Sequence, residues 1–152
     1  MIVSAEISDA KTLTEIALKS KAFWGYSDSQ IESWREDLTI NSKMFEDWNI
    51  YKYLIDNEIA GFYILNRANI RTSFLEFLFV APNFIGNGIG KKLLDHACNY
   101  CISGSCAILN VLSDPNAEKF YAKYGFKVIE RRESSIEGRF LPEMELEFPE
   151  NM

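Results

Sequence analysis

The chain has 152 residues, of which 47% are hydrophobic, 25% charged and 14% aromatic, a composition typical of a folded globular protein. Its formal net charge of −6 argues against a surface that follows nucleic-acid phosphates or an anionic membrane. No apolar run approaches the roughly 20 residues of a membrane-spanning helix. With no linker or repeat, the sequence predicts a single domain over residues 1–152.

The first part of the chain predicts one strand and two helices. Residues 2–7 favour a short strand, and Ser8-Asp9 offers an N-cap for a helix with apolar residues at helical spacing. A second helix begins near Ser27, because Ser27 and Gln30 have the spacing of a capping box.

An aromatic connector, residues 22–26, lies between the two predicted helices. Trp24 and Tyr26 within it are candidates for the wall of a ligand site, since binding residues often lie on loops over a scaffold. A packed helix corner explains the same aromatic residues equally well.

Three strands follow in the middle of the chain. Trp48–Ile55 and Ile59–Leu65 predict a hairpin joined by a tight polar turn. Phe74–Val80 is apolar except for Glu76 and predicts a central strand buried on both faces, which Pro82 ends.

The second half of the chain predicts two helices and three strands. A helix extends to about Cys101, and the strand Ala107–Leu112 follows it. Asp114-Pro115-Asn116 begins a further helix that Gly125 ends. Two closing strands are expected at Phe126–Arg131 and Met144–Phe148.

A glycine-rich loop, Gly86-Asn87-Gly88-Ile89-Gly90, connects the central strand to the helix after it. A helix N-terminus presents N–H groups that bind anions, and glycines let a phosphate approach the backbone. The third glycine, Gly90, comes one residue too early for a dinucleotide fingerprint, which needs glycine where Lys91 stands, and Ile85 and Lys92 do not fit an NTPase loop. The pattern therefore indicates a pyrophosphate loop without a metal requirement.

Two motifs, residues 78–94 and residues 116–126, together resemble the GNAT N-acetyltransferase superfamily. The first contains Leu78-Phe79-Val80-x-Pro82 and the glycine loop, and the second reads Asn116-Ala117-Glu118-Lys119-Phe120-Tyr121-x-x-Tyr124-Gly125-Phe126. The stretch that contains both motifs, residues 78–126, spans about a third of the chain, and the preceding strand, two helices, hairpin and central strand follow the order of that family.

The resemblance implies an α+β fold with a mixed, twisted, mostly antiparallel central sheet flanked by helices and splayed between the fourth and fifth strands. It also implies acetyl-CoA as cosubstrate, with the pantetheine in the splay and the pyrophosphate on the N–H groups of residues 86–91. Ile85 replaces the Gln or Arg usual in the family. The residues so assigned to acetyl-CoA are Leu78, Phe79, Val80, Ile85, Gly86, Asn87, Gly88, Ile89, Gly90, Lys91, Asn116 and Tyr121.

Three groups are candidates for the chemistry. Glu76 is the candidate base, because burial penalises a charged carboxylate and so makes it more basic; a structural carboxylate is the alternative. By resemblance, Tyr121 protonates the departing thiolate, although it could equally belong to the core. The backbone N–H of Val80 is the candidate donor to the thioester carbonyl.

The sequence thus predicts an acetyl-CoA-dependent N-acetyltransferase that transfers the acetyl group directly to an amine of a small molecule. Transfer to a protein N-terminus or lysine is one alternative, and a non-catalytic acyl-CoA-binding module is another. Arg139 is a weak candidate for gripping a substrate carboxylate, with a salt bridge at the rim as the alternative. His96 is expected to be structural or at the surface, and exposed strand edges near the C-terminus would allow a homodimer.

The cysteines Cys98, Cys101 and Cys106 include one C-x-x-C pair. Both members of the pair lie late in a predicted helix, and no second ligand pair completes a metal site, so we expect core cysteines and no metal. An odd number of cysteines without an export signal predicts a cytoplasmic protein.

Overall fold

The computed structural model describes residues 1–134 and 136–149. The helices and 3₁₀ turns are η1 (Ile7–Asp9), α1 (Ala10–Phe23), α2 (Asp28–Leu38), α3 (Ser42–Asp47), η2 (Pro82–Phe84), α4 (Ile89–Ser103), η3 (Pro115–Ala117) and α5 (Glu118–Tyr124). The strands are β1 (Ile2–Ser4), β2 (Asn49–Ile55), β3 (Glu58–Asn66), β4 (Thr72–Val80), β5 (Ile108–Leu112), β6 (Lys127–Glu133) and β7 (Phe140–Glu147).

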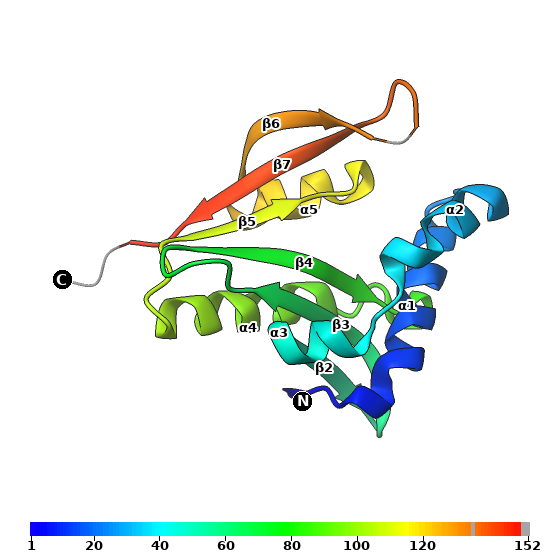
Figure 1. Ribbon diagram of the computed structural model, residues 1–152, viewed down its shortest axis with the longest axis horizontal. Coiled ribbons are helices and arrows are strands. Elements are labelled where there is room, and N and C mark those ends of the chain that lie inside the picture. The colour runs from blue at the N-terminus through cyan, green and yellow to red at the C-terminus, as the bar shows by residue number, and fades with distance from the viewer. Residues whose placement is uncertain (135, 150–152) are drawn as a thin grey trace. The chain divides into compact units, whose positions relative to one another are not determined.

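The described strands form one sheet in the order β1-β2-β3-β4-β5-β7-β6 (Figure 1). The pair β4–β5 is parallel, and β1–β2, β2–β3, β5–β7 and β6–β7 are antiparallel. The ladder between β4 and β5 covers Thr72–Leu75, whereas β4 itself continues to Val80. The predicted α+β fold with a mixed, mostly antiparallel sheet is therefore confirmed.

Two compact units divide the chain, and β4 and α4 each contribute residues to both. The first unit contains Met1–Leu65 and Phe77–Ala97, and the second contains Asn66–Glu76 and Cys98–Met152. The single domain over residues 1–152 stays a prediction.

The core of the first unit lies between α1 and the strand β3. Leu13 and Ala17 of α1 and Phe62 and Ile64 of β3 are fully buried in it. The capping box of α2 forms as predicted: the backbone N–H of Gln30 donates to Ser27 Oγ at 3.2 Å, and the backbone N–H of Ser27 donates to Gln30 Oε1 at 3.0 Å.

The short helix α3 was not predicted from the sequence. Asn41 caps it by accepting a hydrogen bond from the backbone N–H of Met44 at 3.0 Å. The helix has only 6 residues, too few for an apolar stripe to repeat. The β2–β3 turn was predicted, and Asp56 and Asn57 in it have φ of 50° and 66°, as a two-residue type I′ turn requires.

The prediction that the central strand is buried on both faces is wrong. Along β4, Ser73, Leu75 and Phe77 are buried, whereas Glu76 is exposed and Phe74 is half-buried. This alternation is the period of two that is expected when only one face of a strand packs on a core. Apolar side chains at successive positions concealed it in the sequence.

The end of the second unit differs from the prediction in its boundaries. The helix expected from Asp114 begins as η3 and continues as α5, with Gly125 at φ 126° behind it. The last two strands are longer than expected, because β6 reaches Glu133 and β7 begins at Phe140.

The three cysteines are buried, free thiols, as predicted for core positions. Burial, together with the neighbouring Cys106, raises the pKa of Cys101 to about 12.

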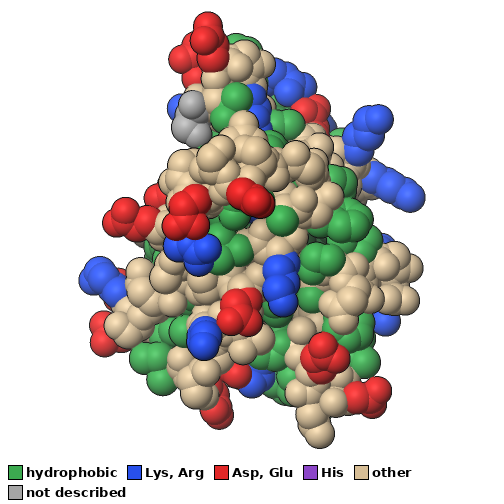
Figure 2. All heavy atoms as spheres, turned by 90° about the vertical axis from the view of Figure 1, so that its right-hand side faces the viewer, with side chains coloured by type: hydrophobic (Ala, Val, Ile, Leu, Met, Phe, Trp, Pro, Cys, Tyr) green, Lys and Arg blue, Asp and Glu red, His purple; other side chains and the backbone are tan. Residues whose placement is uncertain are grey.

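None of the helices in the described part of the chain is long and apolar enough to cross a bilayer. The cytoplasmic location and the homodimer stay predictions. On the face shown in Figure 2, acidic and basic side chains are interspersed, with hydrophobic side chains between them.

Candidate active site

The glycine loop forms a turn that only glycine adopts without strain. Gly86 and Gly88 have φ of +94° and +73°, and a Cβ built on either would meet no atom within 4 Å. Asn87 Nδ2 donates to the carbonyl of Phe84 at 3.0 Å and so ties the loop to η2. Helix α4 begins at Ile89, the residue that follows Gly88 in the chain. The loop therefore leaves open space at a helix N-terminus, where unpaired backbone N–H groups hold anions.

Two side chains beside the loop are oriented to solvent. Ile85 is 43% exposed at the end of η2. Lys91 is bound to Asp95, one turn further along α4, by an ion pair of 3.2 Å. Both side chains are therefore accessible to solvent beside the loop.

The C-terminal end of β4 is held from two sides in the first unit. Ser20 Oγ on α1 donates to the carbonyl of Val80 at 2.8 Å. A Cβ on Gly61 of β3 would stand 2.8 Å from the carbonyl oxygen of Phe79, so this position requires glycine. Leu78, Phe79 and Val80 are each half-buried.

The aromatic connector separates into two parts. Tyr26 packs edge-on against Trp34 of α2, with ring centroids 4.9 Å apart. Trp24 is 49% exposed and contacts Phe23. Tyr26 thus packs against α2, whereas Trp24 pairs with its neighbour Phe23 at the surface.

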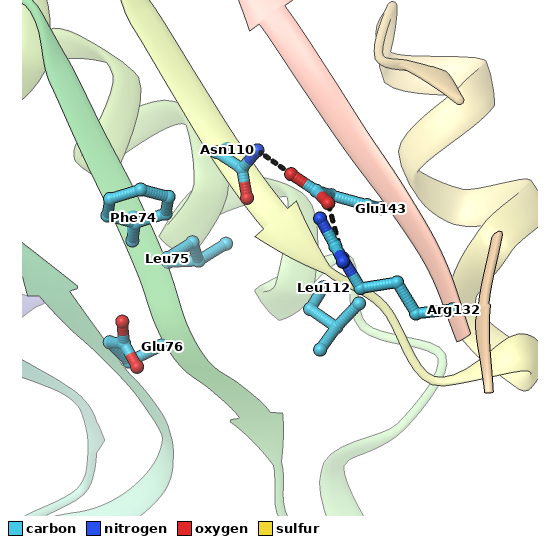
Figure 3. Close-up of a pocket in the computed structure, with 7 residues that line it drawn as sticks. All are labelled: Phe74, Leu75, Glu76, Asn110, Leu112, Arg132 and Glu143. Carbon is cyan, nitrogen blue, oxygen red and sulfur yellow. Dashed lines mark hydrogen bonds and ion pairs between the residues drawn. The ribbon is translucent and has the colours of Figure 1, made fainter. Parts of the chain in front are cut away.

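A pocket of about 400 Å³ lies in the second unit (Figure 3). Asn110, Arg132 and Glu143 point toward one another there, and Asn110 Nδ2 donates to Glu143 at 2.8 Å while Arg132 Nε donates to it at 2.6 Å. The hydrogen bond from Asn110, followed by Arg132, holds the pKa of Glu143 below its ordinary value. The pocket is lined by Phe74, Leu75, Glu76, Asn110, Leu112, Arg132 and Glu143.

Glu76 lines this pocket but is not buried. Its Oε1 accepts a hydrogen bond of 3.4 Å from Asn66 Nδ2, and the side chain is exposed. The expectation that this carboxylate is buried is therefore wrong. Its place on the wall of the pocket leaves the role of a base as a prediction.

Tyr121 is buried among aromatic rings. It is 4% exposed, and its ring lies 5.1 Å from that of Phe120 and 5.2 Å from that of Phe126, measured between centroids. Burial raises the pKa of Tyr121. The phenol therefore keeps its proton at neutral pH, which a general acid requires.

Asn116 and Arg139 meet at one carboxylate. Asp114 Oδ1 accepts from Asn116 Nδ2 at 2.9 Å, and Asp114 Oδ2 binds Arg139 in an ion pair of 2.9 Å. The side chains of Arg139 and Asp114 are only 15% and 12% exposed. Arg139 was considered for gripping a substrate carboxylate or for a salt bridge, and in the structure it forms the salt bridge.

His96 contacts two tyrosines in the first unit. Its Nδ1 lies 2.7 Å from the hydroxyl of Tyr63, and its ring centroid lies 4.7 Å from that of Tyr51. Burial lowers the pKa of His96. Of the two expectations for His96, these contacts fit a structural residue rather than one at the surface.

Several pocket residues were missed from the sequence, namely Asn110, Arg132 and Glu143. They come from three strands that pair only in the folded sheet, so no local spacing connects them. The one available signal was the polar Asn110 within an otherwise apolar strand.

Comparison with known proteins gives a family. A model described as an acetyltransferase (GNAT) domain matches residues 10–148. The peptidyl-lysine N-acetyltransferase YjaB of Salmonella typhimurium is 33% identical over 93 residues, which make up 61% of this chain and 59% of that protein. The aligned part thus spans less than two thirds of either.

Solved structures agree with the fold. The PaiA N-acetyltransferase of Thermoplasma acidophilum, in complex with coenzyme A, has a TM-score of 0.80 and 24% identity over 97% of this chain and 98% of its own. The ribosomal-protein-S18-alanine N-acetyltransferase of Escherichia coli has a TM-score of 0.72 and 21% identity, over 97% and 92%. The chain belongs to the GNAT acetyltransferase family, whose enzymes use acetyl-CoA as cosubstrate.

Proposed function

We propose that this protein transfers the acetyl group of acetyl-CoA directly to an amine of a small molecule. The observation that carries the proposal is the glycine loop. Its two positive-φ glycines leave open space at the N-terminus of α4. A diphosphate fits such a site, because backbone N–H groups and the helix dipole both favour negative charge.

In the first unit, we assign the rest of acetyl-CoA to the end of β4. The pyrophosphate binds the N–H groups of residues 86–91, and the pantetheine pairs with the backbone of Leu78 and Val80 as an added strand would. The hydrogen bond from Ser20 to the Val80 carbonyl supports this assignment, because it fixes the backbone that must pair. The N–H of Val80 donates to the thioester carbonyl in this proposal.

In the second unit, we assign Asn116 to the pantetheine and Tyr121 to the leaving group. Acetyl-CoA supplies the acetyl group as a thioester. The carbon–nitrogen bond forms as the carbon–sulfur bond breaks, and Tyr121 donates its proton to the departing sulfur. The protonated phenol supports this role, because a tyrosine has a proton to donate at neutral pH.

The acceptor amine is assigned to the pocket beside Glu76. An alkylamine has a pKa near 10.4, so it must lose a proton before it attacks. Glu76 takes that proton, directly or through water, because it is the exposed carboxylate on the pocket wall. Glu143 is held by Asn110 and Arg132 and therefore shapes the pocket. A volume of about 400 Å³ suits a small molecule.

A peptide acceptor is the second candidate. The relative from Salmonella typhimurium is named for peptidyl-lysine, and the Escherichia coli structure for an alanine of ribosomal protein S18. Arg132 in the pocket wall is 52% exposed, so the pocket opens to solvent, as a lysine side chain entering from outside would need.

A thiol-release assay distinguishes the candidates. We expect turnover with one or more small amines from a panel of amino acids, polyamines and aminoglycosides. Turnover confined to lysine-containing or N-terminal peptides would favour the second candidate. Tight acetyl-CoA binding without thiol release from any acceptor would leave a non-catalytic binding module.

A further inference from the structure

Three aromatic rings surround the ammonium group of Lys21. Lys21 Nζ lies 5.6 Å from the ring centroid of Trp34, 5.9 Å from that of Phe79 and 6.0 Å from that of Tyr26. These distances are within the range of cation–π attraction. Among the described residues, Arg67 and Lys92 each lie over one ring, whereas Lys21 lies over three. We call Tyr26, Trp34 and Phe79 the cage.

The cage is held by packing that does not involve Lys21. Tyr26 and Trp34 are edge to face at 85° and so form two walls of a corner. The third wall, Phe79, lies 6.0 Å from both Phe62 and Phe77, measured between centroids. All three residues of the cage are half-buried, so each keeps some surface exposed to solvent.

The cage adjoins the backbone that we assign to acetyl-CoA. Phe79 immediately precedes Val80 in β4, and Ser20, the neighbour of Lys21, donates its hydrogen bond to the Val80 carbonyl. Lys21 and its cage therefore lie beside the end of β4. A cation bound there would be next to the position proposed for the thioester.

We propose that the cage binds a cationic group of the acceptor, and that Lys21 occupies it when the acceptor is absent. This inference rests on the proposed function. The amine that reacts must be neutral, so the caged group is a second positive charge on the same molecule. The acceptor class is thus an amine that carries another ammonium group. When the acceptor binds, it displaces the Lys21 ammonium group, which moves into solvent on the flexible lysine side chain.

Direct binding to the protein without acetyl-CoA tests the cage. The probe is choline, and its matched control is 3,3-dimethylbutan-1-ol, which has the same shape without the charge. In Lys21→Met, calorimetry should show choline binding about tenfold tighter than in the unchanged protein, because the internal competitor is gone. The affinity for the neutral alcohol should not increase.

Two double variants show whether the gain in choline affinity depends on the cage. Trp34→Leu in the Lys21→Met background should abolish it, whereas Phe23→Leu in the same background, which removes an exposed aromatic ring outside the cage, should leave it intact. An equal gain for the alcohol, a gain that survives Trp34→Leu, or no gain at all overturns the inference. If Lys21→Met unfolds, as circular dichroism would show, Lys21→Gln takes its place under the same criteria.

Acetyl transfer is not part of this measurement, so the cage and the proposed function fail separately. A second arm uses turnover: 1,5-diaminopentane should have a KM at least about tenfold below that of pentylamine, and Trp34→Leu should remove the difference. Choline binding without turnover would reject only the function. Turnover with equal KM for both amines would reject the cage.

Discussion

Gly88 and Gly138 share a backbone conformation but differ in surroundings. Their φ values are +73° and +78°, and a Cβ on either would meet no atom within 4 Å. Replacement of either by Glu therefore costs a similar backbone strain, about 1–2 kcal/mol. Gly88→Glu should also abolish acetyl-CoA binding, because its carboxylate enters the space proposed for the pyrophosphate, and Gly138→Glu should not. Calorimetry with both folded variants checks this; equal affinities would reject the loop as the binding site.

Glu76 is the residue at which proton removal from the amine can be tested. Glu76→Gln keeps the size of the side chain and should lower turnover by about 10²–10⁴, since a positioned base is lost. The rise of activity with pH should move to higher pH, because only amine that is already neutral can then react. Glu58→Gln, an exposed change at the start of β3, is the control. A normal rate with a normal pH profile would assign Glu76 to structure.

Tyr121 separates an enzyme from a binding module. Tyr121→Phe removes only the hydroxyl and keeps the ring between Phe120 and Phe126, so stability and acetyl-CoA affinity should change little. Turnover should fall at least about tenfold if the phenol protonates the leaving thiolate. The fall should shrink with an acyl donor whose thiol is more acidic. Tyr124→Phe on the same helix is the control, and equal losses with both donors would reject the role.

At the scale of elements, His96 connects α4 to β3 and makes stability depend on pH. Because burial lowers the pKa of His96, the unfolded chain takes up a proton more readily than the folded one. The free energy of unfolding should therefore fall as pH decreases below the ordinary histidine value of about 6.5. Urea unfolding at pH 7.5 and pH 5.5 measures this. His96→Gln should reduce the difference between the two pH values; an unchanged difference would contradict the linkage.

The edge strand β6 shows how one residue alters an element. Val128 pairs with Met144 and Glu130 with Glu143, so Ile129 between them is an extra residue, a bulge. Within the part of the sheet that the structure describes, β6 is the last strand. A bulge interrupts the regular spacing of backbone groups with which another strand would pair. The bulge therefore disfavours a homodimer built by extending the sheet through β6.

At the scale of the whole molecule, local signals explain which features the sequence predicted. The capping box of Ser27 and Gln30, the helix end at Gly125 and the glycine loop each depend on residues a few positions apart. The Asn110–Glu143–Arg132 cluster depends on pairing between β5, β7 and β6, and the cage depends on Phe79 reaching Lys21. Contacts between residues so far apart have no period or spacing that the sequence alone reveals.

The division of the chain into two compact units has a consequence for proteolysis of the protein and for recombination of its gene. Each compact unit consists of two separate segments of sequence, and β4 and α4 continue across the boundaries between them. No single backbone cleavage, and no single break in the gene, can release one unit whole. We therefore expect one calorimetric unfolding transition, as the predicted single domain requires, and no stable fragment from limited proteolysis. Two resolved transitions would contradict this expectation. Recombination between genes should likewise transfer the coding sequence of both units together.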